Sequence, residues 1–160
     1  MLYLQYTRYI SFIDDKYEYN NLEYKKKLWT LKFQNCSKNI GGLYFVIYSD
    51  NDISTAHFKK TDCLKDPLTN KYMYSNNDCN ANQDESKYIL LTKQYGIKKV
   101  YLSCNTTSTI GQISFNSNGS IYSSLGSDPQ EIIKRCYLYL YDKNDHNITI
   151  TIEPKTGYIY

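Results

Sequence analysis

The chain has 160 residues, about the size of one domain and enough to bury a hydrophobic core. Its residues are 41% hydrophobic and 22% charged, so we expect a folded chain rather than a disordered one. The formal net charge of +3 is small and its lysines are spread among acids, which argues against a chain built mainly to bind nucleic acid or a membrane surface.

The tyrosine content is high, at 19 residues. Tyrosine favours strands, and its ring packs while its hydroxyl stays in water. A compositional bias of the genome toward Tyr, Lys, Asn and Ile is an alternative source of part of this excess. The content alone therefore indicates β-structure without indicating a function.

The five cysteines favour an oxidising compartment. They are far apart and form no Cys-x-x-Cys pair: Cys36, Cys63, Cys79, Cys104 and Cys136. Two disulfides and one remaining thiol are the simplest arrangement. The alternative is a reduced cytosolic protein with buried cysteines.

The first residues have neither the basic nor the apolar region of a signal peptide. No stretch approaches the roughly 20 apolar residues of a membrane-spanning helix. We therefore expect this sequence to be the exported part of a longer protein, whose membrane helix precedes Met1.

The segment from Leu2 to Tyr17 has the period of an amphipathic helix. Its apolar positions recur at spacings of three and four: Leu2, Tyr6, Tyr9, Ile10, Ile13 and Tyr17. Polar residues occupy the other side: Thr7, Arg8, Ser11, Asp14 and Asp15. Asn20-Asn21 is expected to end the helix.

After the helix the period changes to two, as in the alternating residues Trp29, Leu31 and Phe33. Strands are predicted over 29–33, 43–48, 53–58, 100–102, 113–115, 121–122, 137–141, 148–152 and 158–160. Asn118-Gly119 predicts a tight hairpin turn, because both positions tolerate positive φ. One short helix is expected from Tyr88 to Tyr95, stopped by Gly96, after a long polar loop.

This order of elements predicts the α+β class, with an N-terminal amphipathic helix packed on an antiparallel sheet or β-sandwich. We expect a single domain over 1–160, with residues 1–19 forming the helical part and 28–160 the β-rich part.

No catalytic or metal site is predicted, and we expect neither an enzyme nor a cofactor. His57 and His146 stand apart from each other, and no nucleophile motif is present. Asp14 and Asp15 are adjacent on the predicted helix and so point about 100° apart. The acids Asp50 and Asp52 lack the spacing of a calcium loop and are expected in a turn.

One sequence motif indicates a specific covalent modification. Residues 145–149, Asp-His-Asn-Ile-Thr, contain Asn-x-Thr with an acid two residues before Asn147. This resembles the extended acceptor sequence of bacterial N-glycosylation. Asn105 and Asn118 match only the shorter Asn-x-Ser/Thr pattern.

Several short segments, in their order, resemble the GspH/FimT family of minor pseudopilins. The closing pair of strands and the following Thr156-Gly157 resemble the end of that family's domain. The segment from Gly111 to Phe115, running into Asn118-Gly119, resembles its earlier hairpin. Three further segments resemble a bacterial subgroup of prepilin-type proteins: 8–17, 29–33 and 65–69.

The resemblance implies a subunit that assembles with other pseudopilins and with inner-membrane secretion components, in type II secretion or DNA uptake. It implies a periplasmic domain anchored in the bacterial inner membrane by a helix that precedes this sequence. The segment from Leu2 to Tyr17 would be the C-terminal half of that helix. We expect part of its apolar stripe to face neighbouring subunits and four residues to lie mainly in the core: Tyr6, Tyr9, Ile10 and Ile13.

The last residues differ from those of DNA-binding relatives, which end in Gly-Arg-x-Arg. Here Gly157 is followed by Tyr158-Ile159-Tyr160, without either arginine. DNA is therefore a possible partner that this tail does not support. The alternative function is an extracytoplasmic domain that binds nucleic acid or glycans through exposed tyrosines.

Two disulfides are suggested by the positions of the cysteines among the predicted elements. Cys104 follows one strand and Cys136 precedes another, so a bridge between them is expected. Cys63 and Cys79 flank the polar loop and are expected to close it, although Cys36 can replace any of these partners.

Overall fold

The computed structural model describes residues 1–52, 57–105, 108–123 and 130–160. It begins with helix α1 (Leu2–Ile13) and continues into two antiparallel sheets. The predicted α+β class is therefore confirmed. Among the described residues, no helix has the length and apolar content that crossing a bilayer requires.

Helix α1 ends before the predicted end at Tyr17. The Asp14 carboxylate accepts a hydrogen bond of 2.9 Å from the Trp29 indole and lies 2.7 Å from the Lys16 ammonium. These contacts tie the end of the helix to the start of the first strand, so the chain leaves the helix at this point.

The first sheet has four strands in the order β2-β1-β4-β5. Its strands are β1 (Trp29–Asn35), β2 (Leu43–Tyr48), β4 (Gln112–Phe115) and β5 (Ile121–Tyr122). All six residues of β2 are buried, in agreement with its continuous apolar sequence.

The second sheet has three strands in the order β3-β6-β7. Its strands are β3 (Lys99–Leu102), β6 (Cys136–Tyr141) and β7 (Asn147–Ile152). The chain end returns beside β7, where Ile159 forms a bridge with Ile152. The chain end therefore pairs with β7 only over a short stretch and does not form the strand predicted over residues 158–160.

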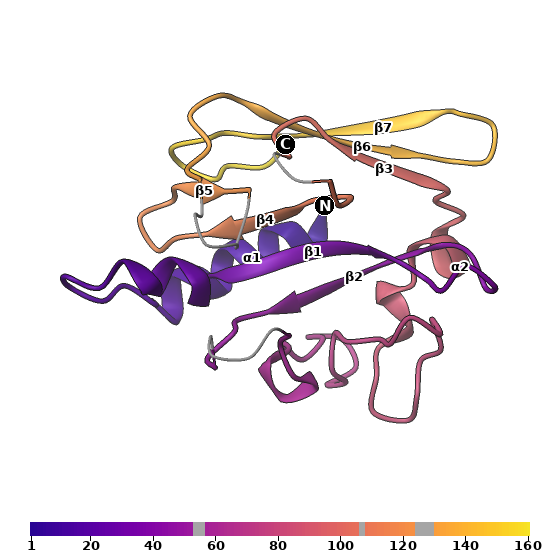
Figure 1. Ribbon diagram of the computed structural model, residues 1–160. Helices are drawn as coiled ribbons and strands as arrows, with labels where there is room; N and C mark the ends of the chain where they lie inside the picture. Colours follow the sequence, from indigo (N-terminus) through magenta and orange to yellow (C-terminus); the bar gives the residue numbers. More distant parts are fainter. Residues whose placement is uncertain (53–56, 106–107, 124–129) are drawn as a thin grey trace.

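The main core lies between the two sheets and α1. It includes Leu4 from the helix, Leu31 and Phe115 from the first sheet, and Leu138 and Ile152 from the second. Figure 1 shows the second sheet above the first, with α1 behind β1 and β4. The helix packs against these two strands.

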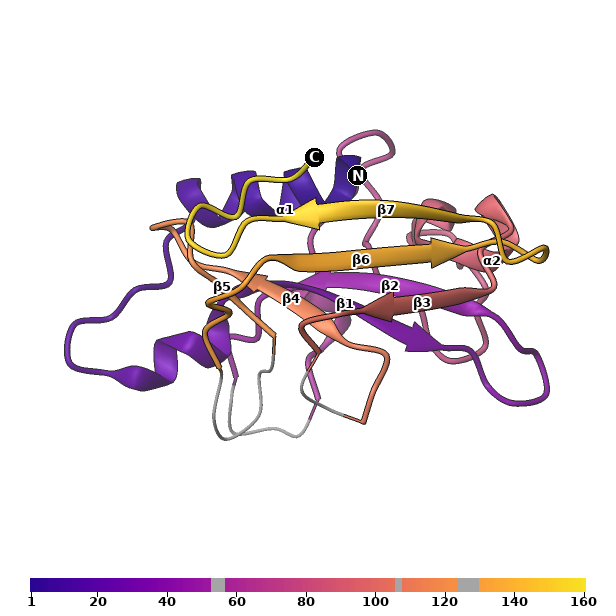
Figure 2. The same ribbon diagram turned by 90° about the horizontal axis from the view of Figure 1, so that it is seen from above.

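The N- and C-termini lie close together in both views (Figures 1 and 2). The Arg8 Nε group donates a hydrogen bond of 3.0 Å to the Thr156 carbonyl. A Cβ atom added to Gly157 would lie 3.3 Å from the same Nε atom and 3.1 Å from the Gly119 carbonyl. The C-terminal turn therefore packs closely on α1 and on the β4–β5 turn.

Where the structure describes the connections, they contain short helices and no further named strands. These helices are η1 (Leu22–Lys27), η2 (Lys60–Asp62), η3 (Lys87–Ile89) and α2 (Leu91–Tyr95). Gly96 ends α2 with a φ of 67°, which confirms its predicted role as a helix stop.

The structure differs from the sequence prediction at one turn and at one strand. At the predicted Asn118-Gly119 turn only Gly119 has positive φ. Most of the strand predicted over 53–58 lies outside the described residues, and its last two positions, 57 and 58, are not in a strand.

Candidate assembly surface on the N-terminal helix

Helix α1 turns a different side toward the core from the one predicted. Its buried residues are Leu4, Thr7, Ile10 and Ser11. Two of these, Thr7 and Ser11, belong to the side that the sequence indicated as polar. Of the four residues expected in the core, only Ile10 is buried.

Local hydrogen bonds explain why Thr7 and Ser11 can be buried. The Thr7 hydroxyl donates to the Tyr3 carbonyl at 2.7 Å, and the Ser11 hydroxyl donates to the Arg8 carbonyl at 2.7 Å. Each hydroxyl is thus satisfied within the helix and costs little to bury. The small side chains also let the helix approach the first sheet closely.

The opposite side of α1 is apolar and faces outward. We call Leu2, Tyr6, Tyr9 and Ile13 the outer stripe. Leu2, Tyr9 and Ile13 are 55%, 57% and 62% exposed, and Tyr6 is half-buried. The prediction that Tyr9 and Ile13 lie in the core was wrong. An apolar row along one side of a helix is a surface that another helix can cover.

An apolar cavity of about 550 Å³ opens at the N-terminal end of α1, between the two sheets. Leu2 lines this cavity and also begins the outer stripe. The other lining residues include Phe33 and Phe45 of the first sheet and Leu140 and Ile150 of the second. The outer stripe and the cavity thus share Leu2 at this end of the helix.

The Tyr3 hydroxyl, at the wall of this cavity, donates to the Asp66 carboxylate at 3.4 Å. Burial, with the nearby Asp66 charge, raises the pKa of Tyr3. Asp66 is itself buried and accepts a short hydrogen bond from the Ser86 hydroxyl. These polar groups join the helix to the 66–86 loop.

A second feature lies on the outer face of the second sheet. We call Tyr101, Tyr137, Tyr139 and Tyr141 the tyrosine ladder. Successive ring centroids are 5.8 Å apart from Tyr101 to Tyr139, 6.3 Å from Tyr137 to Tyr139 and 6.4 Å from Tyr139 to Tyr141. The Lys99 ammonium lies 5.2 Å from the Tyr141 ring centre. The ladder is a continuous aromatic surface with a cation at one end.

The structure pairs four of the five cysteines. Cys104 is joined to Cys136, as the sequence suggested, and Cys36 is joined to Cys79. The prediction of a Cys63–Cys79 bridge was wrong, because Cys63 is a buried free thiol. The two disulfides indicate a domain that folds in an oxidising compartment, either periplasmic or extracellular.

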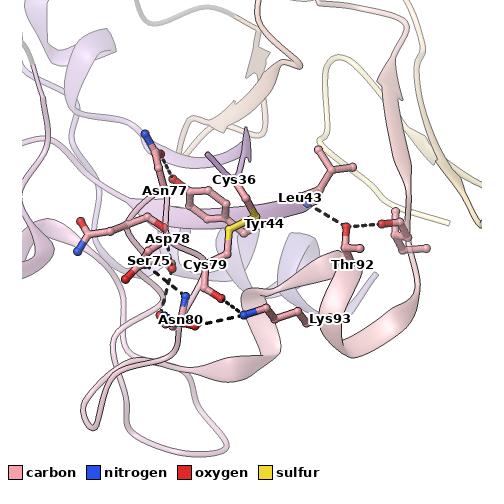
Figure 3. The surroundings of a disulfide bond; sticks show 12 residues. Cys36, Leu43, Tyr44, Ser75, Asn77, Asp78, Cys79, Asn80, Thr92 and Lys93 are labelled. Carbon is pink, nitrogen blue, oxygen red and sulfur yellow. Dashed lines mark hydrogen bonds between the residues drawn. A yellow bond between two sulfur atoms is a disulfide. The ribbon is translucent and has the colours of Figure 1, made fainter. Parts of the chain in front are cut away.

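Figure 3 shows why Cys79 meets Cys36. The Lys93 ammonium of α2 donates to the Cys79 carbonyl at 2.7 Å, and the Tyr44 hydroxyl donates to Asn77 at 2.9 Å. These bonds bring the polar loop against β2 and α2, next to Cys36 at the end of β1. The sequence contains no local signal for this contact.

Two of the groups that the sequence singled out, Asp50 and His146, make local contacts within turns. Asp50 accepts a bond from the Asp52 backbone at 3.2 Å, as in a turn. Asp142 lies 3.2 Å from the His146 imidazole in the β6–β7 turn. The described residues contain no group of three or more His, Cys, Asp or Glu side chains placed to hold a metal ion.

Comparison with models of known protein families, with curated proteins and with solved structures found no match for this chain.

Proposed function

We propose that this chain is a non-enzymatic subunit of an extracytoplasmic assembly, which contacts its neighbouring subunits through the outer stripe of α1. The observation that supports this most is the exposure of Leu2, Tyr9 and Ile13 in one row. Burying a half-exposed leucine or isoleucine contributes roughly 1 kcal/mol. The row therefore favours contact with another apolar surface over contact with water.

The partner that fits this surface best is a helix. The outer stripe has spacings of four, three and four residues, which is one ridge of an α-helix. Such ridges pack into the grooves between the side chains of a second helix. We expect the neighbouring subunits to present similar helices.

More specifically, we propose that the chain is a minor pseudopilin of a type II secretion or DNA-uptake system. The ordered resemblance to the GspH/FimT family supports it, as do a leading helix, β-rich structure and two disulfides. In this form a membrane helix precedes α1 and anchors the domain in the inner membrane. The tail from Gly157 to Tyr160 provides no arginine for DNA.

Charge substitution in the outer stripe tests the proposal. In the native host, with the full-length gene, Ile13→Glu should reduce the amount of this subunit in the purified assembly at least about tenfold, since burying an unpaired carboxylate costs several kcal/mol. The matched control is Ile133→Glu, because Ile133 is 77% exposed and belongs to the connection before β6 rather than to α1. Equal incorporation of the two variants would contradict the proposal.

The tyrosine ladder favours a second candidate, a domain that binds the flat faces of bases or sugar rings. Tyr139 lies at its centre, with ring neighbours on both sides. Stacking on such a ring contributes about 1–3 kcal/mol per base. If the domain has this second function, Tyr139→Ala should weaken binding to single-stranded DNA, or to a glycan identified on a glycan array, about tenfold. Tyr19→Ala should not weaken it. Absence of binding to either ligand at low salt rejects it.

A further inference from the structure

The chain contains three Asn-x-Ser/Thr motifs, which begin at Asn105, Asn118 and Asn147. We propose that Asn147 is the acceptor of an N-linked oligosaccharide, and that the other two are not. This proposal does not depend on the proposed assembly function. Its basis is the difference in geometry among the three sites.

Asn105 is poorly placed to react. Its Nδ2 atom, the nitrogen to which a glycan is attached, donates a hydrogen bond of 2.6 Å to the Thr109 carbonyl. A transferase would have to break this bond before the nitrogen could attack. The hydroxyl residue of this motif, Thr107, lies outside the described residues.

Asn118 is held in the tight turn between β4 and β5. Its carboxamide oxygen accepts a bond of 2.8 Å from the Ser120 backbone, and both Gly119 and Ser120 are buried. A Cβ on Gly119 would lie 3.0 Å from the backbone of Thr156. A transferase must grip the acceptor segment, and here Asn118 is exposed but the Gly119 and Ser120 that follow it are buried, with Gly119 against the C-terminal turn.

Asn147 has the opposite surroundings. It is the first residue of β7, and positions 147 to 149 are all exposed. The Thr149 hydroxyl donates to the Asn147 carboxamide oxygen at 3.3 Å, so the two polar residues of the motif already lie side by side. Within the described part of the chain, the Asn147 Nδ2 atom donates no hydrogen bond.

The preceding turn presents the acid of the extended motif. Asp142 supports this turn by accepting bonds from the backbones of Asn144 at 2.8 Å and His146 at 3.0 Å. Asp145 has a φ of 61° and is exposed. Its carboxylate forms no ion pair with the described residues, so a basic group of a transferase can reach it.

The site also lies on the uncovered half of an edge strand. At its other end β7 is paired with the chain terminus, where Thr151 and Tyr160 exchange backbone bonds of 2.8 and 3.1 Å. Positions 147 to 149 have β6 on one side and no strand on the other, among the described residues. A glycan here would block pairing with another chain along that edge.

The register places the glycan next to the tyrosine ladder. Asn147 lies opposite Tyr141, and Thr149 lies opposite Tyr139, so all four side chains are on the outer face of the sheet. A sugar attached at Asn147 would therefore project over the Tyr141 end of the ladder. Glycosylation would restrict access of any other ligand to that end.

The donor is a polyprenyl-diphosphate-linked oligosaccharide, used by an oligosaccharyltransferase. The Asn147 Nδ2 atom attacks the anomeric carbon of the first sugar and forms the N–C bond. The bond between that carbon and the diphosphate oxygen breaks, and polyprenyl diphosphate leaves with the electron pair. The amide nitrogen loses one proton to a base of the transferase, and nothing is oxidised or reduced.

The test is the intact mass of the protein exported to the periplasm of a bacterium, with and without an oligosaccharyltransferase and its lipid-linked oligosaccharide. We expect a mass increase of one oligosaccharide that depends on the transferase. Asn147→Gln and Thr149→Val should remove it, Asp145→Ala should reduce its occupancy severalfold, and Asn118→Gln should leave it unchanged.

An unmodified wild-type mass in the presence of the transferase would overturn the proposal, and so would a glycan that persists in Asn147→Gln. A thiol count separates loss of the acceptor from loss of the fold. Each variant should show one cysteine thiol after denaturation without reductant, because both disulfides lie away from Asn147.

Discussion

Among single residues, Cys63 has a thiol that the fold isolates. It is buried, and this burial, with the nearby Asp62 carboxylate, raises the pKa of the thiol. The thiolate is the reactive form of cysteine, so a raised pKa makes the group inert near neutral pH. A free cysteine in an oxidising compartment is thereby protected from exchange with the two disulfides.

We predict that native protein does not react with a thiol reagent at pH 8 and that denatured, unreduced protein reveals one thiol. Cys63→Ala should reveal none. Reaction of the native wild-type protein within minutes, or more than one thiol after denaturation, would show that the assignment of the cysteines is incorrect. The measurement is a colorimetric thiol assay in the presence and absence of urea.

Glycine at position 157 is required by both its backbone angle and its neighbours. Its φ is 60°, and an added Cβ would lie 3.2 Å from the Phe115 ring. Gly96 has a similar φ of 67° but no atom within 4 Å of an added Cβ. Comparing substitutions at Gly157 and Gly96 therefore separates the loss of stability caused by backbone strain from the loss caused by steric crowding.

We predict that Gly96→Ala destabilises the protein by roughly 1 kcal/mol, from the left-handed backbone alone. Gly157→Ala should cost about 1–3 kcal/mol more, because the added methyl group crowds a packed site. Urea unfolding followed by circular dichroism measures both. Equal costs for the two variants would mean that the C-terminal turn does not pack on α1 and β4 as described.

At the scale of elements, the disulfides restrain long connections. Cys104 and Cys136 are 32 residues apart and join the end of β3 to the start of β6. Cross-linking a chain over such a separation stabilises the fold by about 3 kcal/mol, mainly by restricting the unfolded state. The Cys36–Cys79 bridge, over 43 residues, attaches the polar loop to the first sheet.

We predict that Cys104→Ala combined with Cys136→Ala lowers the free energy of unfolding by about 3 kcal/mol. Cys63→Ala is the control for loss of a buried cysteine without loss of a disulfide. Urea unfolding without reductant gives both values. A double variant as stable as the control would show that this bridge does not form in solution.

The sequence predicted the existence of most elements, because the period of the apolar residues changes where the structure changes. The alternation at Trp29, Leu31 and Phe33 identified β1, and Gly96 identified the end of α2. The face of α1 was predicted incorrectly because Thr7 and Ser11 count as polar in a helical pattern. Their hydroxyls donate hydrogen bonds to the helix backbone. This general ability of Thr and Ser in helices was the one feature of the sequence that could have indicated their burial.

At the scale of the whole molecule, the arrangement depends on contacts that no local pattern specifies. The β1 residue Thr30 bonds to Ser114 of β4 across 84 positions of sequence, at 2.8 Å between hydroxyl oxygens. The same reason explains the incorrect Cys63–Cys79 prediction, since the loop folds back onto β2 before Cys79 meets Cys36. One part of the tyrosine ladder was likewise hidden, because Tyr101 joins it only through the pairing of β3 with β6, whereas Tyr137, Tyr139 and Tyr141 alternate along one predicted strand.

Buried tyrosines make the whole fold sensitive to alkaline pH. Burial raises the pKa of Tyr44 to about 12 and that of Tyr122 to about 12, from an ordinary value of 10.0. Below pH 10 these phenols are neutral in both states, so their contribution is complete. As pH rises from about 10 to about 12, the unfolded chain ionises first, and stability falls.

We predict that in Cys63→Ala, which lacks the buried thiol with its own raised pKa, the urea midpoint changes little between pH 8 and pH 9 and decreases above pH 10, where the tyrosines of the unfolded chain ionise. In Tyr44→Phe the decrease should be smaller, because phenylalanine has no ionisable group. A midpoint that rises above pH 10 would contradict the burial of these side chains.

The outer stripe of α1 is proposed to contact other subunits. The most direct measurement places a photo-crosslinking amino acid at position 9, in the full-length protein in its native host, and identifies the adducts by mass spectrometry. The control is position 19, where Tyr19 is 81% exposed outside the helix. We expect strong adducts at position 9 with proteins that present an N-terminal apolar helix. Position 9 giving no more adduct than position 19 would contradict it.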